Sequence, residues 1–260
     1  MARFHHTVTV ASVERHRLDE CAELVCDLAE STRSRGQEIV LPDGRAVPDL
    51  RLVRGRHLQS GARYRSAAPE DAELEALVVR EWPRGSAIAV EQVLRTLEFS
   101  GRVTVRLRSP DRPGSLEIEG HMRGSEGASG WSGALRHGSG KAGLDLSAWW
   151  AAAAVAPGAP PPARAPATAR LKHRLGSARL TLTPRAAEEG GWRIDVALRP
   201  LAVTALLFVS APLRRGFVSA VEEAAARWDE AVAHLRGRNR EELRAELTEY
   251  VVREFKDEAT

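Results

Sequence analysis

The sequence predicts an α+β fold in which an antiparallel β-meander is covered by a long amphipathic helix near the carboxyl terminus. Two patterns predict this fold. Short segments alternate aliphatic residues with Arg, Thr or Glu, and turn signals separate them. A stripe of apolar residues at three- and four-residue steps follows the last two of these segments. Because such alternation is typical of a sheet with one solvated face, the helix is the expected cover of the other face.

Composition indicates a folded protein. The chain has 260 residues, of which 43% are hydrophobic, which suits one large domain or two small ones. Its net charge is +3, and only three of its 38 basic residues are lysines. Both signs of charge are mixed along most segments, so nucleic-acid binding is not favoured. The abundance of Arg, Ala and Gly is typical of a GC-rich genome, and we expect a bacterial protein.

Targeting and cofactor signals are weak. The first residues, MARFHHTVTV, lack the charged and apolar regions of a secretory signal, so the cytoplasm is the expected location. The longest nearly uncharged run, residues 144–162, is interrupted by Asp145 and by Pro and Gly, so no membrane span is expected. Cys21 and Cys26 have no companion at a zinc-binding spacing. We therefore expect no metal and no other cofactor.

The first part of the chain predicts a strand followed by a helix. Residues 4–10 alternate in polarity, which places His6 on the apolar face of a strand. Apolar residues then recur at helical spacing after Ser12, which can cap this helix, and the polar run 31–36 ends it.

Residues 37–98 predict an insertion of mixed structure. A turn signal at 42–44 precedes residues 50–53, which have the character of a strand. Residues 69–83 are bounded by prolines and predict a helix. Apolar residues on one helical face predict a second helix over 87–97.

A β-meander is predicted after the insertion. Polarity alternates over 102–108 and 116–122, and the turn sequence DRPG between them predicts a hairpin. Weaker strands are predicted at 131–136 and 142–146, with a Gly/Ser turn between them.

The last third of the chain predicts more strands after a linker. The Pro/Ala-rich residues 156–169 predict an extended loop. A strand can begin over 171–175. Alternation then predicts strands at 178–183 and 192–198, separated by a Gly-containing turn.

Two helices end the sequence. The longer is predicted over 201–235, either kinked at Pro212 or beginning just after it. The shorter is predicted over 241–255. We assign residues 1–236 to a single α+β domain and 237–260 to a carboxyl-terminal helix that can serve as a docking element.

The order of these elements resembles the START-like helix-grip superfamily, which includes polyketide cyclases and lipid-transfer proteins. The similar part reads ARLTLTPRAAEEGGWRIDVALRP, followed by APLRRGFVSAVEEAAARWDEAVAHL. The resemblance implies a cavity between sheet and helix that binds an apolar or amphipathic small molecule or a lipid. Residues on the apolar faces of the first strand, the last two strands and the long helix would line it: His6, Leu180, Leu182, Ile194, Val196, Phe217, Val221 and Trp228.

A second, local resemblance covers about residues 87–124. There, VEQVLRTLEFSGRVTVRL and GSLEIEGHMRG are similar to the helix-then-hairpin core of PATAN-like signalling domains. Those domains are interaction modules without catalytic residues. This alternative implies a non-enzymatic signalling or scaffold protein, and the helix over 241–255 would bind a protein partner or a second copy of the chain.

A third alternative is an enzyme of the cyclase or dehydratase type, so whether the protein is an enzyme stays open. Such an enzyme needs a polar group inside the cavity, and His6 is the candidate, because a partly buried imidazole can act as an acid or base. The other interpretation of His6 is a core histidine that is hydrogen-bonded to a neighbour. No further catalytic residue is assigned.

The remaining polar motifs have structural interpretations. Glu117, Glu119 and His121 share one strand face, which we expect to be solvated because the apolar residues between them take the core face. Residues 138–143 read GSGKAG, but no buried parallel strand precedes them, so a hairpin turn is predicted instead of a nucleotide site. The adjacent tryptophans at 149–150 are interpreted as a buried anchor.

Overall fold

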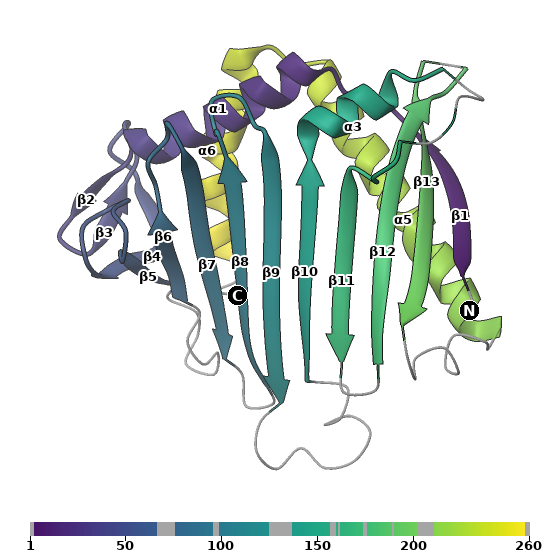
Figure 1. The fold of residues 1–260 in the computed structure, drawn as a ribbon. Coiled ribbons are helices and arrows are strands. Elements are labelled where there is room, and N and C mark those ends of the chain that lie inside the picture. The colour runs from purple at the N-terminus through teal and green to yellow at the C-terminus, as the bar shows by residue number, and fades with distance from the viewer. Residues whose placement is uncertain are drawn as a thin grey trace. The chain divides into compact units, whose positions relative to one another are not determined.

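The chain folds as an α+β protein in a computed structural model (Figure 1). The structure describes residues 3–66, 76–95, 99–124, 137–156, 160, 162–173, 176–188, 190–201 and 211–257. It divides into two compact units. Unit 1 comprises Met1–Arg15, Gly114–Glu117 and Gly138–Arg238, and unit 2 comprises His16–Pro113, Ile118–His137 and Asn239–Thr260.

The sheet of unit 1 is antiparallel, with the strand order β1-β13-β12-β11-β10. Its strands are β1 (Phe4–Val10), β10 (Gly138–Asp145), β11 (Ala167–His173), β12 (Gly176–Ala186) and β13 (Trp192–Leu201). The register places His6 opposite Val196, Val196 opposite Leu182, and Leu182 opposite Ala167. Because directly paired residues project on the same side, this face of the sheet is apolar.

The strands predicted at 4–10, 178–183 and 192–198 are confirmed, and two other predictions for this unit are wrong. Residues 138–143 are part of β10 and not a hairpin turn. The loop predicted over 156–169 ends earlier, because Ala167 already pairs with Leu144 in the sheet. The weaker strand predicted at 131–136 lies outside the described residues.

Two helices belong to unit 1, α3 (Leu146–Ala153) and α5 (Ala211–Arg236). Helix α3 was not predicted; the Asp145 carboxylate caps it by accepting a hydrogen bond from the Ala148 amide at 2.9 Å. The long helix was predicted from residue 201, but Leu201 is the last residue of β13. Pro212 stands at the second position of α5, where the missing amide hydrogen removes no intrahelical hydrogen bond.

Helix α5 covers the apolar face of the unit 1 sheet. Phe217, Val221 and Ala225 of α5 pack against a buried cluster that combines residues of β1, β11, β13 and α3. Val232 is 2% exposed within that cluster. The predicted arrangement of a sheet covered by a long amphipathic helix is therefore present in this unit.

Tryptophan side chains hold this core together at one end. The ring of Trp192, which is 6% exposed, lies 5.8 Å from Trp149, 6.0 Å from Trp150 and 6.0 Å from Trp228 between centroids. These rings come from β13, α3 and α5. The interpretation of Trp149 as a buried anchor is confirmed.

The sheet of unit 2 is also antiparallel. Its strands follow the order β9-β8-β7-β6-β5-β4-β3-β2. The part of β9 from Ile118 onward belongs to this unit. They are β2 (Arg33–Arg35), β3 (Glu38–Val40), β4 (Ala46–Arg54), β5 (Arg63–Ser66), β6 (Ala76–Glu81), β7 (Ala87–Arg95), β8 (Phe99–Arg108) and β9 (Ser115–Gly124). The predicted hairpin of β8 and β9 is confirmed, as is the strand predicted at 50–53.

Both helices predicted inside the insertion are wrong over their described residues. Ala76–Glu81 and Ala87–Arg95 are strands, and they pair with each other. Ala87, Ile88 and Ala89 are all buried, so both faces of β7 are apolar at this end and the alternation that identifies a half-exposed strand is missing. Residues 67–75 and 96–98 lie outside the described part of the chain.

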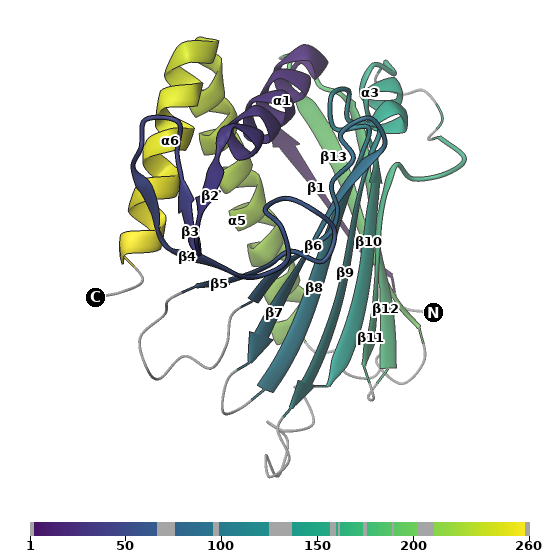
Figure 2. The ribbon, with the colours of Figure 1, turned by 90° about the vertical axis from the view of Figure 1, so that its left-hand side faces the viewer.

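Helices α1 (Arg15–Ser31) and α6 (Arg240–Asp257) form the rest of unit 2, and both helix predictions are confirmed. Figure 2 shows α6 beside β4. Ser12 does not cap α1; its hydroxyl donates to the Gly190 carbonyl at 2.8 Å. Leu28 of α1 and Leu247, Val251 and Val252 of α6 pack in a cluster with apolar residues of β3–β6.

No helix among the described residues has the length and apolar character needed to cross a membrane.

Replacing Trp192 with Ala should destabilise the fold strongly, because the deleted indole leaves a cavity among three other tryptophans. We expect a loss of about 3–5 kcal/mol in the free energy of unfolding. Urea unfolding followed by far-ultraviolet circular dichroism measures it. Trp192→Phe, which keeps a ring in the cavity, should lose much less; equal midpoints for Trp192→Ala and the unmodified protein would contradict the role given to this residue.

Candidate functional site

The structure brings the sequence-predicted site residues together in unit 1. Ile194 and Val196 are buried in the core cluster, and Leu180, Leu182, Phe217 and Val221 pack against it. The Trp228 indole NH donates to the Ala11 carbonyl at 2.8 Å. The first six of these side chains therefore belong to the core of unit 1, while Trp228 is 38% exposed. Their role as ligand contacts stays a prediction.

His6 is tied to the covering helix by a carboxylate. Its Nε2 atom lies 2.6 Å from Oε1 of Glu222 in α5, and the two side chains are 22% and 57% exposed. The imidazole therefore sits at the margin of the core with a hydrogen-bond partner. This geometry corresponds to the structural interpretation of His6, a histidine that is hydrogen-bonded to a neighbour, and its catalytic role stays a prediction.

The polar face of β9 is solvated. Glu119 and His121, 3.4 Å apart, are more than half exposed. Among the described residues, no group of three or more His, Cys, Asp or Glu side chains is placed to hold a metal ion.

A partly buried polar chain that the sequence did not predict lies in unit 2. His57 contacts Tyr64 through Nδ1, 2.9 Å from the hydroxyl, and Thr32 through Nε2, 2.8 Å from the hydroxyl. The Tyr64 oxygen accepts from the Leu58 amide at 2.8 Å, and the Thr32 hydroxyl lies 2.6 Å from the Ala29 carbonyl. Thr32, His57 and Tyr64 come from three separate segments, so no local sequence motif predicts their contact.

These contacts assign the proton on His57. Because the Thr32 hydroxyl donates to a carbonyl, its oxygen accepts from Nε2–H of His57. Because the Tyr64 oxygen accepts from an amide, its own proton is donated to Nδ1 of His57. The neutral imidazole satisfies every partner, and burial lowers the pKa of His57.

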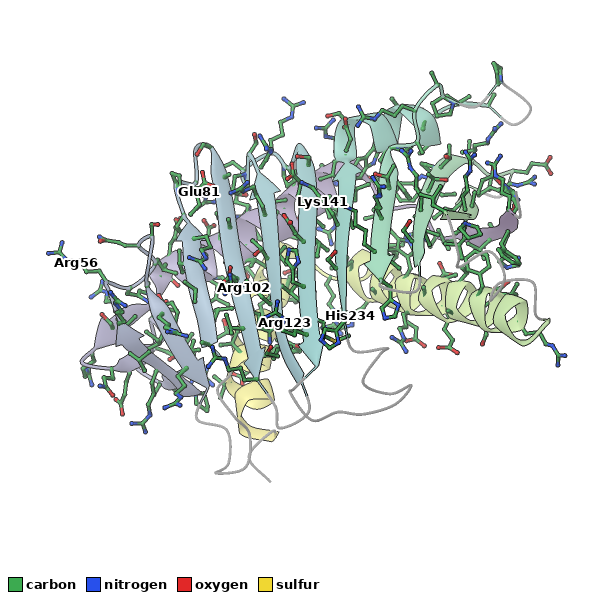
Figure 3. All side chains as sticks on the ribbon, turned by 60° about the horizontal axis from the view of Figure 1, so that its bottom comes forward. Arg56, Glu81, Arg102, Arg123, Lys141 and His234 are labelled. Carbon is green, nitrogen blue, oxygen red and sulfur yellow. The ribbon has the colours of Figure 1, made fainter. Side chains whose placement is uncertain are left out.

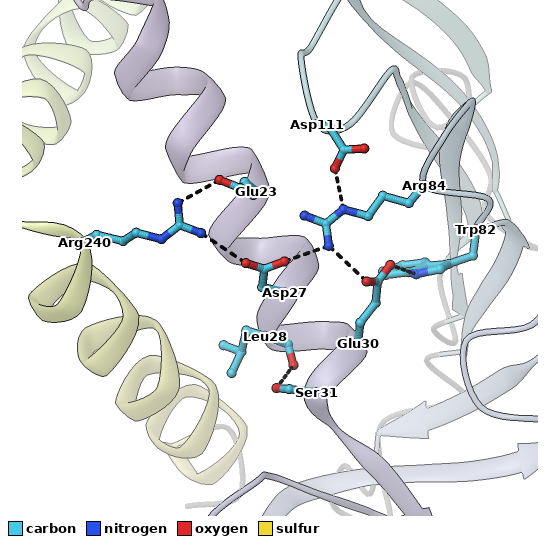
Figure 4. Close-up of polar contacts among 9 residues, drawn as sticks. All are labelled: Glu23, Asp27, Leu28, Glu30, Ser31, Trp82, Arg84, Asp111 and Arg240. Carbon is cyan, nitrogen blue, oxygen red and sulfur yellow. Dashed lines mark hydrogen bonds and ion pairs between the residues drawn. The ribbon is translucent and has the colours of Figure 1, made fainter.

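Two arginines connect α1 to the surrounding elements of unit 2 (Figure 4). Arg84 contacts Asp27 at 2.7 Å, Glu30 at 3.0 Å and Asp111 at 2.5 Å. Arg240 contacts Glu23 at 2.7 Å and Asp27 at 3.2 Å. Hydrogen bonds to Asp27 and then Asp111 raise the pKa of Arg84 further above its ordinary value. Each carboxylate of this cluster is paired with an arginine, so the cluster is best explained as a structural clamp.

One face of the unit 2 sheet is mostly apolar. Paired residues define this face: Leu77 lies opposite Gln92 and Gln92 opposite Val103, while Val79 lies opposite Val90 and Val90 opposite Val105. On β9, a β-carbon at Gly120 would stand 3.8 Å from the Val103 side chain, so Gly120 shares this face. Since side chains alternate, Ile118 and Met122 of the same strand share it too.

This apolar face is covered at one end of unit 2 and exposed at the other. Toward β3–β6 it is buried by α1 and α6, with Tyr64 at 2% and Val79 at 1% exposure. Toward β6, β8 and β9 it reaches the surface. We call four side chains there the exposed apolar face: Leu77 (37%), Val105 (40%), Ile118 (38%) and Met122 (42%).

The opposite face of the same strands is charged. Glu81 and Arg102 are labelled on it in Figure 3. Glu91 is 5% exposed, and Arg80 donates to both its carboxylate oxygens, at 2.6 and 3.2 Å. The sequence rule that placed aliphatic residues on one face and charged residues on the other therefore holds for these strands.

Comparisons with family models, with curated proteins and with solved structures find no match to this chain.

The neutral state of His57 predicts a pH-dependent stability. Because the folded pKa lies below the unfolded value of about 6.5, the unfolded state binds a proton first as the pH falls. The contribution of His57 is thus complete above that pH and is lost as the pH falls toward the folded pKa. The urea midpoint should fall more between pH 7.5 and pH 5 in the unmodified protein than in His57→Gln; equal slopes would contradict this assignment.

Proposed function

We propose that this protein binds an apolar or amphipathic small molecule, and that the hydrocarbon part of the ligand lies on the exposed apolar face of unit 2. The observation that carries the proposal is the exposure of Leu77, Val105, Ile118 and Met122 on one side of neighbouring strands. Single exposed aliphatic residues are common, but several of them on one face of a sheet favour a binding surface.

The chemistry of the face defines the class of ligand. Its four side chains offer only methyl, methylene and thioether groups, so burial of hydrocarbon is the contact they can make, at roughly 25 cal/mol for each Å² of apolar surface covered. Gln92, which is exposed, lies in the same row as Leu77 and Val103 and can meet a polar group of the ligand. An amphipathic molecule with a long apolar part fits both features.

The START-like resemblance implies the same class of ligand but places it between sheet and helix in unit 1. There six of the eight predicted residues belong to the buried core cluster or pack against it, whereas the four apolar side chains of the face in unit 2 are 37–42% exposed. Exposure is the reason for placing the ligand in unit 2.

The alternative of a scaffold protein that docks through α6 has less support. Leu243 of α6 is 5% exposed, and Leu247 and Val251 pack against the core of unit 2. Among the α6 residues whose burial is described, Tyr250, 59% exposed, is the large apolar side chain left to solvent. The apolar stripe predicted for docking is thus largely used inside the unit.

The binding proposal is tested with the triple variant Val105→Thr, Ile118→Thr and Met122→Gln. Each substitution changes the side chain by at most about one non-hydrogen atom while making the face polar. Because the residues are exposed, the melting temperature should change little. We expect affinity for fluorescently labelled palmitate to fall roughly a hundredfold, since each side chain contributes about 1 kcal/mol of apolar burial. Fluorescence titration measures the affinity.

The matched control changes the opposite face of β8 and β9, with Thr104→Asn, Glu119→Gln and His121→Gln, and should bind like the unmodified protein. Val221→Thr tests the interface in unit 1 in the same assay. Loss of binding in Val221→Thr alone would move the ligand to unit 1 and contradict our placement. Absence of binding by the unmodified protein, together with no ligand in native mass spectra, would contradict the function itself.

A further inference from the structure

The outermost strand of the unit 1 sheet has an edge without a partner strand (Figure 1). Among the described residues, β1 pairs with β13 on one side and with no strand on the other. An edge strand presents a row of backbone amide and carbonyl groups, which can pair with a strand of another molecule. The residues of β1 therefore decide whether this edge is protected against such pairing or suited to it.

A close approach shows which backbone groups of β1 point toward β13. A β-carbon at Gly191, the residue before β13, would stand 2.6 Å from the Val10 carbonyl oxygen. Val10 itself lies directly opposite Trp192, the first residue of β13. In an antiparallel ladder, residues that bond to the neighbouring strand alternate with residues whose amide and carbonyl point the other way. Val10 therefore belongs to the series that bonds within the sheet.

Alternation leaves the backbone groups of His5, Thr7 and Thr9 pointing outward, because each lies an odd number of residues before the end of the strand. We call these three residues the open edge. The next residue of the series, Ala11, supports this assignment, because its amide donates to the Asp229 carboxylate of α5 at 2.6 Å. Within the described part of the chain, the outward backbone groups of the open edge have no hydrogen-bond partner.

The open edge lacks the features that protect edge strands. Natural edge strands are kept from pairing by charged side chains, proline, bulges or a very short length. β1 has seven residues, contains no Asp, Glu, Lys, Arg or Pro, and pairs with β13 in an unbroken register. In unit 2, by contrast, the outermost strand β2 has three exposed residues, two of which are arginines. The edge at β2 is therefore protected, whereas β1 is able to pair.

The order of side chains in β1 is complementary to a second copy of the same strand. When two copies run antiparallel with Thr7 opposite Thr7, His5 of one copy lies opposite Thr9 of the other. His6 then lies opposite Val8, which continues the apolar face. Thr–Thr pairs and pairs of an aromatic with a β-branched residue stabilise antiparallel strands, and no like charges are opposed.

The backbone is complementary in the same register. Residues of the open edge then lie directly opposite one another, and opposed residues of this kind exchange both of their hydrogen bonds, which gives about six bonds between the copies. The contact is isologous, with Thr7 on the two-fold axis.

We propose that two copies of this chain associate through the open edge of β1, so that the unit 1 sheet of one copy continues into that of the other. Backbone hydrogen bonds are the main attraction, as in other cases in which a strand is added to an exposed sheet edge. The contact is small, so association is expected at micromolar concentrations. The proposal is independent of the ligand face in unit 2, which lies on other strands.

Sedimentation velocity between about 1 and 200 μM measures the association, and the unmodified protein should change from monomer to dimer over this range. His5→Lys with Thr9→Lys places like charges opposite each other across the contact, whereas His5→Lys with Thr9→Glu places opposite charges there. The second variant should associate at least about tenfold more tightly than the first. Both residues are exposed, so circular dichroism should show that both variants are folded.

The two variants are matched because residues 5 and 9 of one strand are about 13 Å apart and do not pair within one copy. A protein that stays monomeric at the highest concentration would overturn the proposal. Equal association of the two variants would also overturn it, because the register predicts opposite effects.

Amide hydrogen exchange, resolved to single residues by mass spectrometry, tests whether β1 forms the contact. The amides of His5, Thr7 and Thr9 should exchange roughly tenfold more slowly in the dimer than in the dilute monomer. The amides of Val8 and Val10, which bond to β13, should be protected in both. A dimer in which the open edge exchanges as fast as in the monomer uses another surface, and this result would overturn the proposal.

Discussion

The need to cover the apolar face of an antiparallel sheet is the constraint on which the rest of this structure depends. In unit 1, β1, β12 and β13 present Val8, Leu182 and Val196 on one side, and α5 supplies Phe217 and Val221 to bury them. In unit 2, α1 and α6 meet the same requirement, because their apolar residues pack against β3–β6. The apolar stripe of each helix therefore buries an apolar sheet face that would otherwise be exposed to water.

Incomplete covering of a sheet leaves the surface that we propose to bind the ligand. The apolar face of unit 2 runs from Val79, at 1% exposure, to Val105, at 40%, within neighbouring strands. Aliphatic side chains on one face are thus buried at Val79 of β6 and exposed at Val105 of β8. Their exposed fraction depends on whether a covering helix packs against them. On the opposite face of the same strands, the buried carboxylate of Glu91 is paired with Arg80.

Local pattern was sufficient where one face of an element is apolar and the other polar. The strand at 178–183 and the helix α6 are of this kind, and both were predicted correctly. It failed for β7, because Ala87–Ala89 are apolar on both faces and their spacing also fits a helix. The boundary of α5 was misplaced because the end of β13 is apolar too, so hydrophobicity alone could not separate strand from helix.

The sequence by itself determined the two-faced character of the strands, the presence of a covering helix and the grouping of His6 with Val196 and Phe217 in one region. Only the tertiary structure decided the strand register, and with it the exposed apolar face and the polar chain through His57. The physical reason is that alternation and helical periodicity act within a segment of about ten residues. Hydrogen bonds between distant residues and the residual exposure of side chains depend on which segments pair, and this is fixed by packing of the whole chain.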